Sequence, residues 1–433
     1  MIDYKERINK KITISGFAEK VRNLQWVQFI VLRSEGQRIQ VTIEKSIPTN
    51  QKMVETVDKL TNESTITVTG TIKENEKVKM GGMELIPDSI EVTSSSAPEL
   101  PINIANKDAA LIDTRMDNRF LDLRNDVNFH IFKIQTEFVR AMRQYLYDND
   151  FTEIHTPKLI GAASESGSEV FEVNYFGNKA YLAQSPQFYK QMAIAAGYER
   201  VFEVAPAFRA ENSNTNRHAT EFTSFDLEFA NINSYEDVMK VEEELLVAGL
   251  SAVKEKYGDL IKELYGVDVV IPKTPFPRID LQDLYKELSE RYGYKVPDHD
   301  IGDMNAEAEK LTSKYANEVY GHEFIFVTGF SKAKRPFYHM RKNGIPQGYD
   351  LIWRGTEITT GAQREHRYDM LEEQAKEKGL GEDIKFYKDF FKYGCPPHGG
   401  FGLGIDRLTM LLLGLPSLKE TMFLFRGPNR LTP

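Results

Sequence analysis

Residues 208–229 read FRAENSNTNRHATEFTSFDLEF, a polar run enclosed by two more apolar segments. Asn, Ser and Thr side chains bond to nearby backbone groups and favour turns, so the middle of the stretch is predicted to be a loop. After the loop, apolar residues alternate with two acidic ones, Asp226 and Glu228, which predicts a strand with both carboxylates on one face. Two arginines flank the same loop, and unpaired charges are costly to bury. The stretch therefore predicts a hairpin that carries charges of both signs.

The composition is that of a globular protein with two or three domains: 433 residues, 41% of them hydrophobic and 27% charged. The N-terminus has no signal pattern, and no apolar run approaches the roughly 20 residues that a membrane helix needs. A single cysteine, Cys395, excludes an internal disulfide and a cysteine-based zinc cluster. These features predict a cytoplasmic protein.

The net charge of −9 is unevenly distributed. Up to Glu91 there are 14 Lys and Arg against 13 Asp and Glu, and the rest of the chain has 41 against 51. A nucleic acid would thus be bound through local patches and base contacts, because the chain offers no broad basic surface.

The N-terminal part has the pattern of a small β-barrel. Short segments rich in Val, Ile and Thr are separated by turn residues, and one helical pattern precedes the fourth of them. Five strands with a helix in this position are typical of the OB fold, which commonly binds oligonucleotides. The predicted strands are residues 11–21, 26–33, 38–44, 64–73 and 83–92, and the helix is 50–60.

Beyond the barrel the pattern changes. Residues 93–111 are polar, contain two prolines and have no period, so they predict a linker. Residues 126–151 place apolar side chains at helical spacing. The remainder mixes strands and helices without a regular βαβ rhythm, which favours an α+β catalytic domain over a doubly wound one.

Four polar clusters follow residue 150, in residues 163–194, 208–229, 348–371 and 396–415. Each cluster alone is ambiguous, since a single Arg or Glu is more often solvated than functional. Together they meet the needs of a phosphate site. Phosphates require cations, and magnesium prefers oxygen ligands that it shares with the phosphates. The candidate cations are Arg209, Arg217, His218 and Arg407; the candidate ligands are Glu357 and a neighbouring hydroxyl; Phe222 could stack on a base.

Three segments of the chain resemble the motifs of class II aminoacyl-tRNA synthetases. "FTEIHTPKL" is similar to motif 1, "FRAE…RH…EF" to motif 2 and "GFGLGIDR" to motif 3. "QSPQFYKQ", "QREHR" and the terminal "RLTP" resemble the archaeal and eukaryotic type of aspartyl-tRNA synthetase over essentially the whole chain. The resemblance implies an OB-fold barrel plus an antiparallel catalytic sheet flanked by helices, and a homodimer built through motif 1.

The resemblance also implies the domain limits and the ATP site. Residues 1–95 would be the anticodon-binding barrel, 96–126 a linker and 127–433 the catalytic domain. Arg209 and Arg407 would be catalytic, and Glu357 with Thr360 would hold Mg²⁺, although the family usually has Ser at the latter position. The implied ATP contacts are Arg209, Glu211, Arg217, His218, Phe222, Glu357 and Arg407.

Aspartate is the amino acid that the resemblance implies. Lys190 and Arg364 would bind its side-chain carboxylate, and Glu165, Gln187 and Asp226 would surround its ammonium group. An uncharged asparagine would leave the two cations unpaired and desolvated. An asparaginyl enzyme is the main alternative, and a tRNA-free amide ligase and a noncatalytic RNA-binding paralogue are two others.

The resemblance further implies that Phe29, Gln40 and Glu84 contact the tRNA anticodon, since unpaired bases are read by aromatic stacking and edge hydrogen bonds. Glu19 stands where relatives often carry Trp or His, a choice that tends to separate enzymes dedicated to tRNA(Asp) from relaxed ones. Glu matches neither, so charging of tRNA(Asn) as well stays open.

Overall fold

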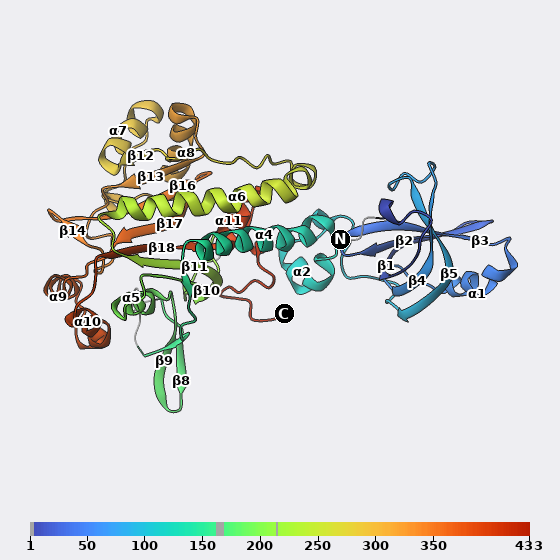
Figure 1. Cartoon of the computed structure of the whole chain (residues 1–433), viewed down its shortest axis with the longest axis horizontal. Coiled ribbons are helices and arrows are strands. Elements are labelled where there is room, and N and C mark those ends of the chain that lie inside the picture. Colours follow the sequence, from blue (N-terminus) through green and yellow to red (C-terminus); the bar gives the residue numbers. More distant parts are fainter. Residues whose placement is uncertain (1–3, 162–168, 214) are drawn as a thin grey trace. The chain divides into compact units, whose positions relative to one another are not determined.

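The computed structural model describes residues 4–161, 169–213 and 215–433 (Figure 1). These residues form two compact units, one up to His130 and one from Ile131 onward. Within the described residues, no helix is long and apolar enough to cross a membrane.

The first unit contains a closed five-stranded barrel with the strand order β1-β2-β3-β5-β4. Alternate residues of the second, third and fourth strands are buried, and Ile, Leu and Val side chains fill the interior. The predicted OB-like barrel is therefore confirmed, including the helix between the third and fourth strands. Its elements are β1 (Lys11–Asn23), β2 (Val27–Ser34), β3 (Gln37–Glu44), α1 (Gln51–Asp58), β4 (Thr65–Glu74) and β5 (Met83–Ser94).

The segment after the barrel is partly ordered into short helices, α2 (Ile112–Asp117) and α3 (Arg119–Asp122). Ile102, Ile104 and Leu121 form a small apolar cluster there. Polar composition predicted a linker, but these few apolar residues are enough to pack the segment within the first unit.

The second unit is built on an eight-stranded sheet with the order β12-β13-β16-β17-β18-β11-β10-β6. Neighbouring strands are antiparallel except at the two ends, where β12 pairs with β13 and β6 with β10 in parallel. This confirms the α+β class with a mainly antiparallel sheet. The strands are β6 (Thr152–Glu153), β10 (Arg200–Phe208), β11 (Glu221–Ala230), β12 (Arg278–Asp280), β13 (Phe324–Thr328), β16 (Gly348–Trp353), β17 (Thr356–Gln363) and β18 (His398–Gly404).

Helices flank this sheet, and the longest, α6 (Tyr235–Tyr265), runs along β17 and β18 (Figure 1). Ser234 and Asp237 form a capping box at its start, which satisfies two backbone N–H groups. Gly249 allows α6 to approach α4 (Asp126–Asp148), because a Cβ there would lie 2.3 Å from the Phe138 ring. The others are α5 (Gln187–Ala195), α7 (Leu281–Tyr292), α8 (Ala306–Tyr320), α9 (Tyr368–Glu377), α10 (Lys385–Lys392) and α11 (Ile405–Leu413).

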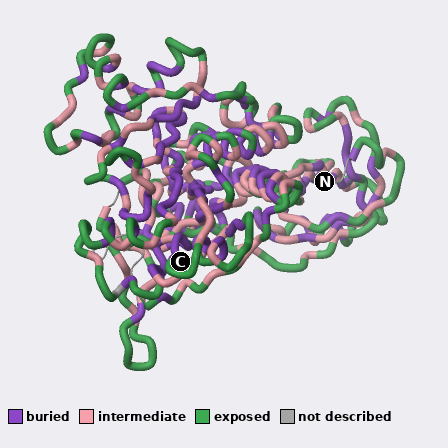
Figure 2. The backbone as a smooth tube through the Cα atoms, turned by 60° about the vertical axis from the view of Figure 1, so that its left-hand side comes forward, coloured by how far each residue is buried: buried purple, intermediate pink, exposed green. Residues whose placement is uncertain are grey.

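Small strands complete the unit: β7 (Leu159–Ile160), β8 (Glu172–Tyr175) and β9 (Asn178–Leu182) form one sheet, and β14 (Arg341–Lys342) pairs with β15 (Ile345–Pro346). Figure 2 shows that buried backbone is concentrated in the interior of the unit. In β11, six consecutive residues, 224–229, are buried. This strand lies inside the sheet with α5 and α11 packed against it, so its polar side chains are buried as well.

Candidate active site

A cavity of about 310 Å³ lies over strands β11, β17 and β18 of the large sheet. Residues far apart in the sequence meet there, because β11 pairs with β18 and β18 with β17. The loop predicted between Phe208 and Glu221 is a loop in its described residues and supplies one wall. The predicted site residues that line the cavity are Gln187, Arg209, Glu211, Arg217, His218, Phe222, Asp226, Glu357, Thr360, Arg364 and Arg407.

Two other predicted residues are not among those that line the cavity. Lys190 is buried but does not line the cavity, and its ammonium nitrogen lies 3.1 Å from Asp226 Oδ1. Glu165 lies outside the described residues.

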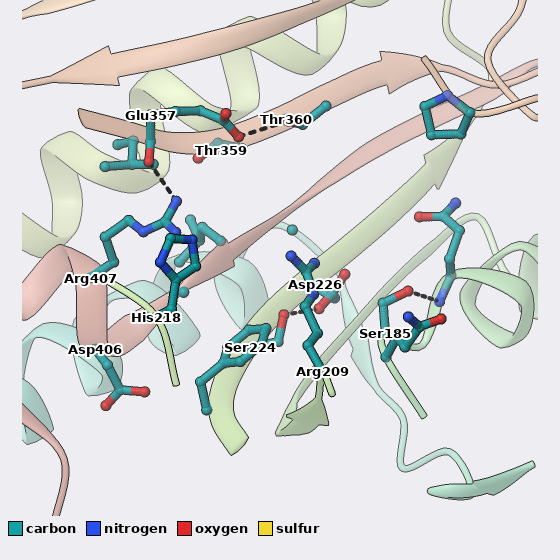
Figure 3. A pocket seen from close by; sticks show the side chains of 18 of the residues that line it. Ser185, Arg209, His218, Ser224, Asp226, Glu357, Thr359, Thr360, Asp406 and Arg407 are labelled. Carbon is teal, nitrogen blue, oxygen red and sulfur yellow. Dashed lines mark hydrogen bonds between the residues drawn. The ribbon is translucent and has the colours of Figure 1, made fainter. Parts of the chain in front are cut away.

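One end of the cavity is rich in cations. Figure 3 shows His218 and Arg407 near Glu357, whereas Arg209 lies nearer to Asp226. Arg407 Nη1 donates to the backbone oxygen of Glu357 at 2.8 Å, which holds the guanidinium over the cavity. The Arg209 guanidinium lies 5.3 Å from the centre of the Phe222 ring and its side chain is 45% exposed. These cations have few fixed partners, so they are available to an anionic ligand.

Glu357, Thr360 and Asp350 form an oxygen-rich group at the same end. Thr360 Oγ1 lies 3.0 Å from Glu357 Oε1 and 2.9 Å from Asp350 Oδ1, so its single O–H is shared between the two carboxylates. Burial, and then the Asp350 charge, raise the pKa of Glu357 to about 7. Two carboxylates held together in this way favour a cation, and hydroxyl and carboxylate oxygens suit Mg²⁺. No group of three His, Cys, Asp or Glu side chains suited to a metal occurs in the described part of the chain, so an ion here would take its other ligands from substrate or water.

The other end of the cavity is a buried ionic cluster around Glu228. Arg364 Nε and Nη2 donate to its two carboxylate oxygens at 2.8 and 3.2 Å, and Lys190 Nζ lies 3.4 Å from Oε2. Burial opposes ionisation, but the charges of Arg364 and Lys190 hold the pKa of Glu228 below its ordinary value. The cluster therefore carries two cations beside the carboxylates of Asp226 and Glu228.

The three other predicted residues lie on neighbouring strands of the barrel, where Phe29 and Gln40 are half-buried and Glu84 is buried. Phe29 on β2 pairs with Thr42 on β3, and Gln40 on β3 pairs with Glu84 on β5. Gln40 Nε2 donates to Thr42 Oγ1 at 3.2 Å, and Thr42 donates to Glu84. The three positions therefore form one patch with an aromatic ring and hydrogen-bonding groups. Such a patch can stack on and bond to unpaired bases.

Glu19 forms ion pairs with two arginines of the same unit. Its Oε2 accepts from Arg38 Nε at 2.6 Å and lies 3.5 Å from Arg33 Nη1. Arg38 also pairs with Asp126 at 2.5 Å. Its carboxylate is thus engaged in an ion-pair network.

Comparison with known protein families agrees with both parts of the fold. The model of the class II tRNA synthetases (D, K and N) matches residues 111–426, and that of the OB-fold nucleic acid binding domain matches residues 12–93. The chain belongs to the class II tRNA synthetases of the D, K and N group. It is accordingly an aminoacyl-tRNA ligase with an OB-fold anticodon-binding domain.

Relatives of this synthetase match it over nearly its full length. The aspartate–tRNA(Asp/Asn) ligase of Methanopyrus kandleri is 43% identical, with 99% of this chain and 97% of the relative covered. The aspartate–tRNA(Asp) ligase of Pyrococcus abyssi is 42% identical, with 99% and 98% covered. The structure of asparaginyl-tRNA synthetase from Pyrococcus horikoshii complexed with asparaginyl-adenylate has a TM-score of 0.90 at 31% identity, with 99% and 97% covered.

Arg335 and His339 are two basic residues of the synthetase's cavity that were not predicted from the sequence. Arg335 is buried, donates to Asp350 at 2.5 Å and lies 3.7 Å from the centre of the Phe330 ring. His339 is buried beside Arg364. Both come from the aperiodic stretch "KAKRPFYHM", where only the density of basic and aromatic residues could have drawn attention.

Proposed function

We propose that the chain is an aspartate–tRNA ligase that activates L-aspartate with ATP and transfers it to the 3′ end of tRNA(Asp). The observation that carries this proposal is the buried pair of cations, Lys190 and Arg364, at the end of the cavity opposite the phosphate-binding end. The negative side-chain carboxylate of an aspartate would be attracted to these two positive charges. The names of full-length relatives support the same choice.

The proposed reaction has two steps. An aspartate carboxylate oxygen attacks the α-phosphorus of ATP, a new P–O bond forms, and pyrophosphate leaves with the electrons of the broken bond. A terminal ribose hydroxyl of the tRNA then attacks the activated carbonyl, and AMP leaves. Arg209 would stabilise the negative charge that develops on the α-phosphate, and positioning supplies much of the remaining acceleration.

The other predicted ATP contacts would fall into two groups, one at the phosphates and one at the adenine. Arg217, His218 and Glu211 lie at the loop wall and would meet the γ-phosphate end, while Phe222 and Arg407 would enclose the adenine. Glu357 and Thr360 would hold Mg²⁺, which neutralises phosphate charge when bound.

Aspartate would bind next to the ionic cluster. Arg364 lines the cavity and would contact the side-chain carboxylate, while Lys190 acts from behind the wall through Asp226 and Glu228. Asp226, Gln187 and Glu165 would surround the ammonium group. Because Glu228 occupies the two-pronged face of Arg364, the substrate would bond to the guanidinium through an N–H of Nη1.

The two compact units suit a division of labour. Residues 1–95 would read the anticodon through Phe29, Gln40 and Glu84, residues 127–433 would catalyse both steps as a homodimer, and residues 96–126 would connect them. As a tRNA-charging enzyme the protein would act in the cytoplasm. The name of the Methanopyrus kandleri relative extends the proposal to tRNA(Asn) as a second substrate.

Aminoacylation with labelled aspartate, using purified tRNA(Asp) and tRNA(Asn) in parallel, tests the proposal. Charging of tRNA(Asp) is expected, and charging of both would identify a relaxed enzyme. The alternative function is that of an asparaginyl-tRNA synthetase, which the structural similarity to the Pyrococcus horikoshii enzyme supports. That alternative predicts ATP–pyrophosphate exchange with asparagine and none with aspartate, and this result would overturn the proposal.

A further inference from the structure

His339 faces the amino-acid end of the cavity from a segment that the three family motifs do not include. Its backbone forms a bridge with Arg364, flanked by hydrogen bonds from Met340 N to Gln363 O at 3.0 Å and from Glu365 N to Tyr338 O at 2.9 Å. Residues paired in this way place their side chains on the same face. The imidazole lines the cavity although only 1% of the residue is exposed.

The hydrogen-bond inventory of Arg364 shows what the imidazole does there. A guanidinium has five N–H donors in a fixed plane. Nε and Nη2 donate to Glu228, Nη2 also donates to Gly400 O at 2.8 Å, and Nη1 lies 3.4 Å from His339 Nε2. Four donors are thereby directed to partners. One Nη1 hydrogen remains without a partner among the described residues, and Arg364 lines the cavity.

The imidazole can accept this bond because it is neutral. Burial, and then the charges of Arg364, Arg335 and Lys190, lower the pKa of His339 well below its ordinary value. A neutral ring that accepts at Nε2 carries its hydrogen on Nδ1. Nδ1 is buried without a hydrogen-bond partner, so the ring pays a desolvation cost that an apolar side chain would avoid.

We propose that His339 is a positioning residue for aspartate recognition: Nε2 holds one Nη1 hydrogen of Arg364, and this directs the other toward the side-chain carboxylate of the substrate. The inference rests on the proposed function, since it assumes that a carboxylate enters this end of the cavity. A ring that served only packing would have no reason to retain a buried nitrogen without a partner. An apolar residue of similar size would fill the space at lower cost.

The test compares two substitutions in ATP–pyrophosphate exchange. His339→Leu removes the acceptor, whereas His339→Gln can place an amide oxygen near the position of Nε2. A hydrogen bond to a charged group corresponds to about a tenfold to hundredfold effect. We expect His339→Leu to raise the KM for aspartate at least tenfold and to lower the preference for aspartate over asparagine. The KM for ATP should stay within twofold, and His339→Gln should recover most of the aspartate affinity.

Thermal unfolding separates positioning from packing. His339→Leu removes a buried nitrogen without a partner, but it also removes the acceptor of one Arg364 N–H, so the two effects on stability oppose each other. We therefore expect its unfolding temperature to stay close to that of the wild type. If the wild type activates aspartate and His339→Leu retains its KM within twofold, the inference is wrong. Equal losses for both substitutions, in ATP and aspartate alike, would also overturn it. A wild type that does not activate aspartate would instead refute the proposed function.

Discussion

Glu228 organises the amino-acid end of the cavity at the cost of a buried ionic cluster. Its carboxylate engages Arg364 through two hydrogen bonds and lies 3.4 Å from Lys190 Nζ, and all three side chains are nearly inaccessible. Buried ion pairs contribute little net stability, because desolvation offsets most of their attraction. The cluster is better explained by positioning: it fixes the Arg364 guanidinium at the cavity wall, with Lys190 behind it.

Arg209 provides the sharpest test of the phosphate-binding end. Arg209→Ala should lower the rate of adenylate formation about 100- to 1000-fold, because it removes a preorganised charge next to the developing negative charge. Stability should change little, since the side chain is 45% exposed and its nearest carboxylate, Glu211, is 4.0 Å away. ATP–pyrophosphate exchange and thermal unfolding measure the two effects.

Arg291 offers a matched control on the surface helix α7. Its side chain is 44% exposed and pairs with Glu287, and it does not line the cavity. Arg291→Ala should leave exchange unchanged. An Arg209→Ala variant as active as this control would show that the loop cation does not act on ATP.

Single residues of the site differ in how far the sequence predicts them. Arg209, Glu357 and Arg407 fall within recognisable segments, and all three line the cavity. Arg335 and His339 could not be selected, because their roles depend on contacts with Asp350 of β16 and with Arg364 after β17. No local pattern encodes such contacts.

At the scale of elements, β11 shows both the strength and the limit of pattern analysis. Alternating apolar and acidic residues predicted a strand, and β11 confirms it. Alternation is usual for a half-exposed strand, yet Asp226 and Glu228 are buried. Their partners come from elements 36 and 136 residues away in the chain, Lys190 on α5 and Arg364 after β17, so their burial had no local signal.

The contact between α6 and β16 predicts how stability depends on pH. Glu242 of α6 is fully buried and accepts from Tyr349 Oη of β16 at 2.7 Å, and burial raises its pKa to about 8. Between the ordinary pKa of a glutamate and about 8, the folded protein keeps a proton that the unfolded chain releases. The free energy of unfolding therefore falls as pH rises through this range, by at most about 1.4 kcal/mol per pH unit from this group.

Glu242→Gln removes that titration while keeping an oxygen that accepts from Tyr349. Denaturant unfolding at pH 5, 6.5 and 8 should show the variant gaining stability relative to the wild type as pH rises. Glu255→Gln, an exposed substitution on the same helix, is the control and should preserve the wild-type trend. A constant difference between Glu242→Gln and wild type across these pH values would contradict the buried-acid explanation.

At the scale of the whole molecule, two cores support two tasks. The barrel has its own cluster of buried apolar residues, and the catalytic sheet has others. Strand periodicity predicted the barrel well, because β2, β3 and β4 alternate between its interior and its surface. The strand order of the catalytic sheet could not be predicted from periodicity, since most of its pairings join segments distant in sequence.

This division predicts that the two activities can be separated by substitution. Gln40 lies on the barrel patch with Phe29 and Glu84, so Gln40→Ala should weaken base recognition and lower kcat/KM for tRNA about tenfold. ATP–pyrophosphate exchange, which needs no tRNA, should be unaffected. Gln51→Ala, an exposed change on α1 of the same barrel, should alter neither reaction. Equal losses in exchange and tRNA charging for Gln40→Ala would mean that the barrel does more than read RNA, because a base contact has no route to adenylate formation.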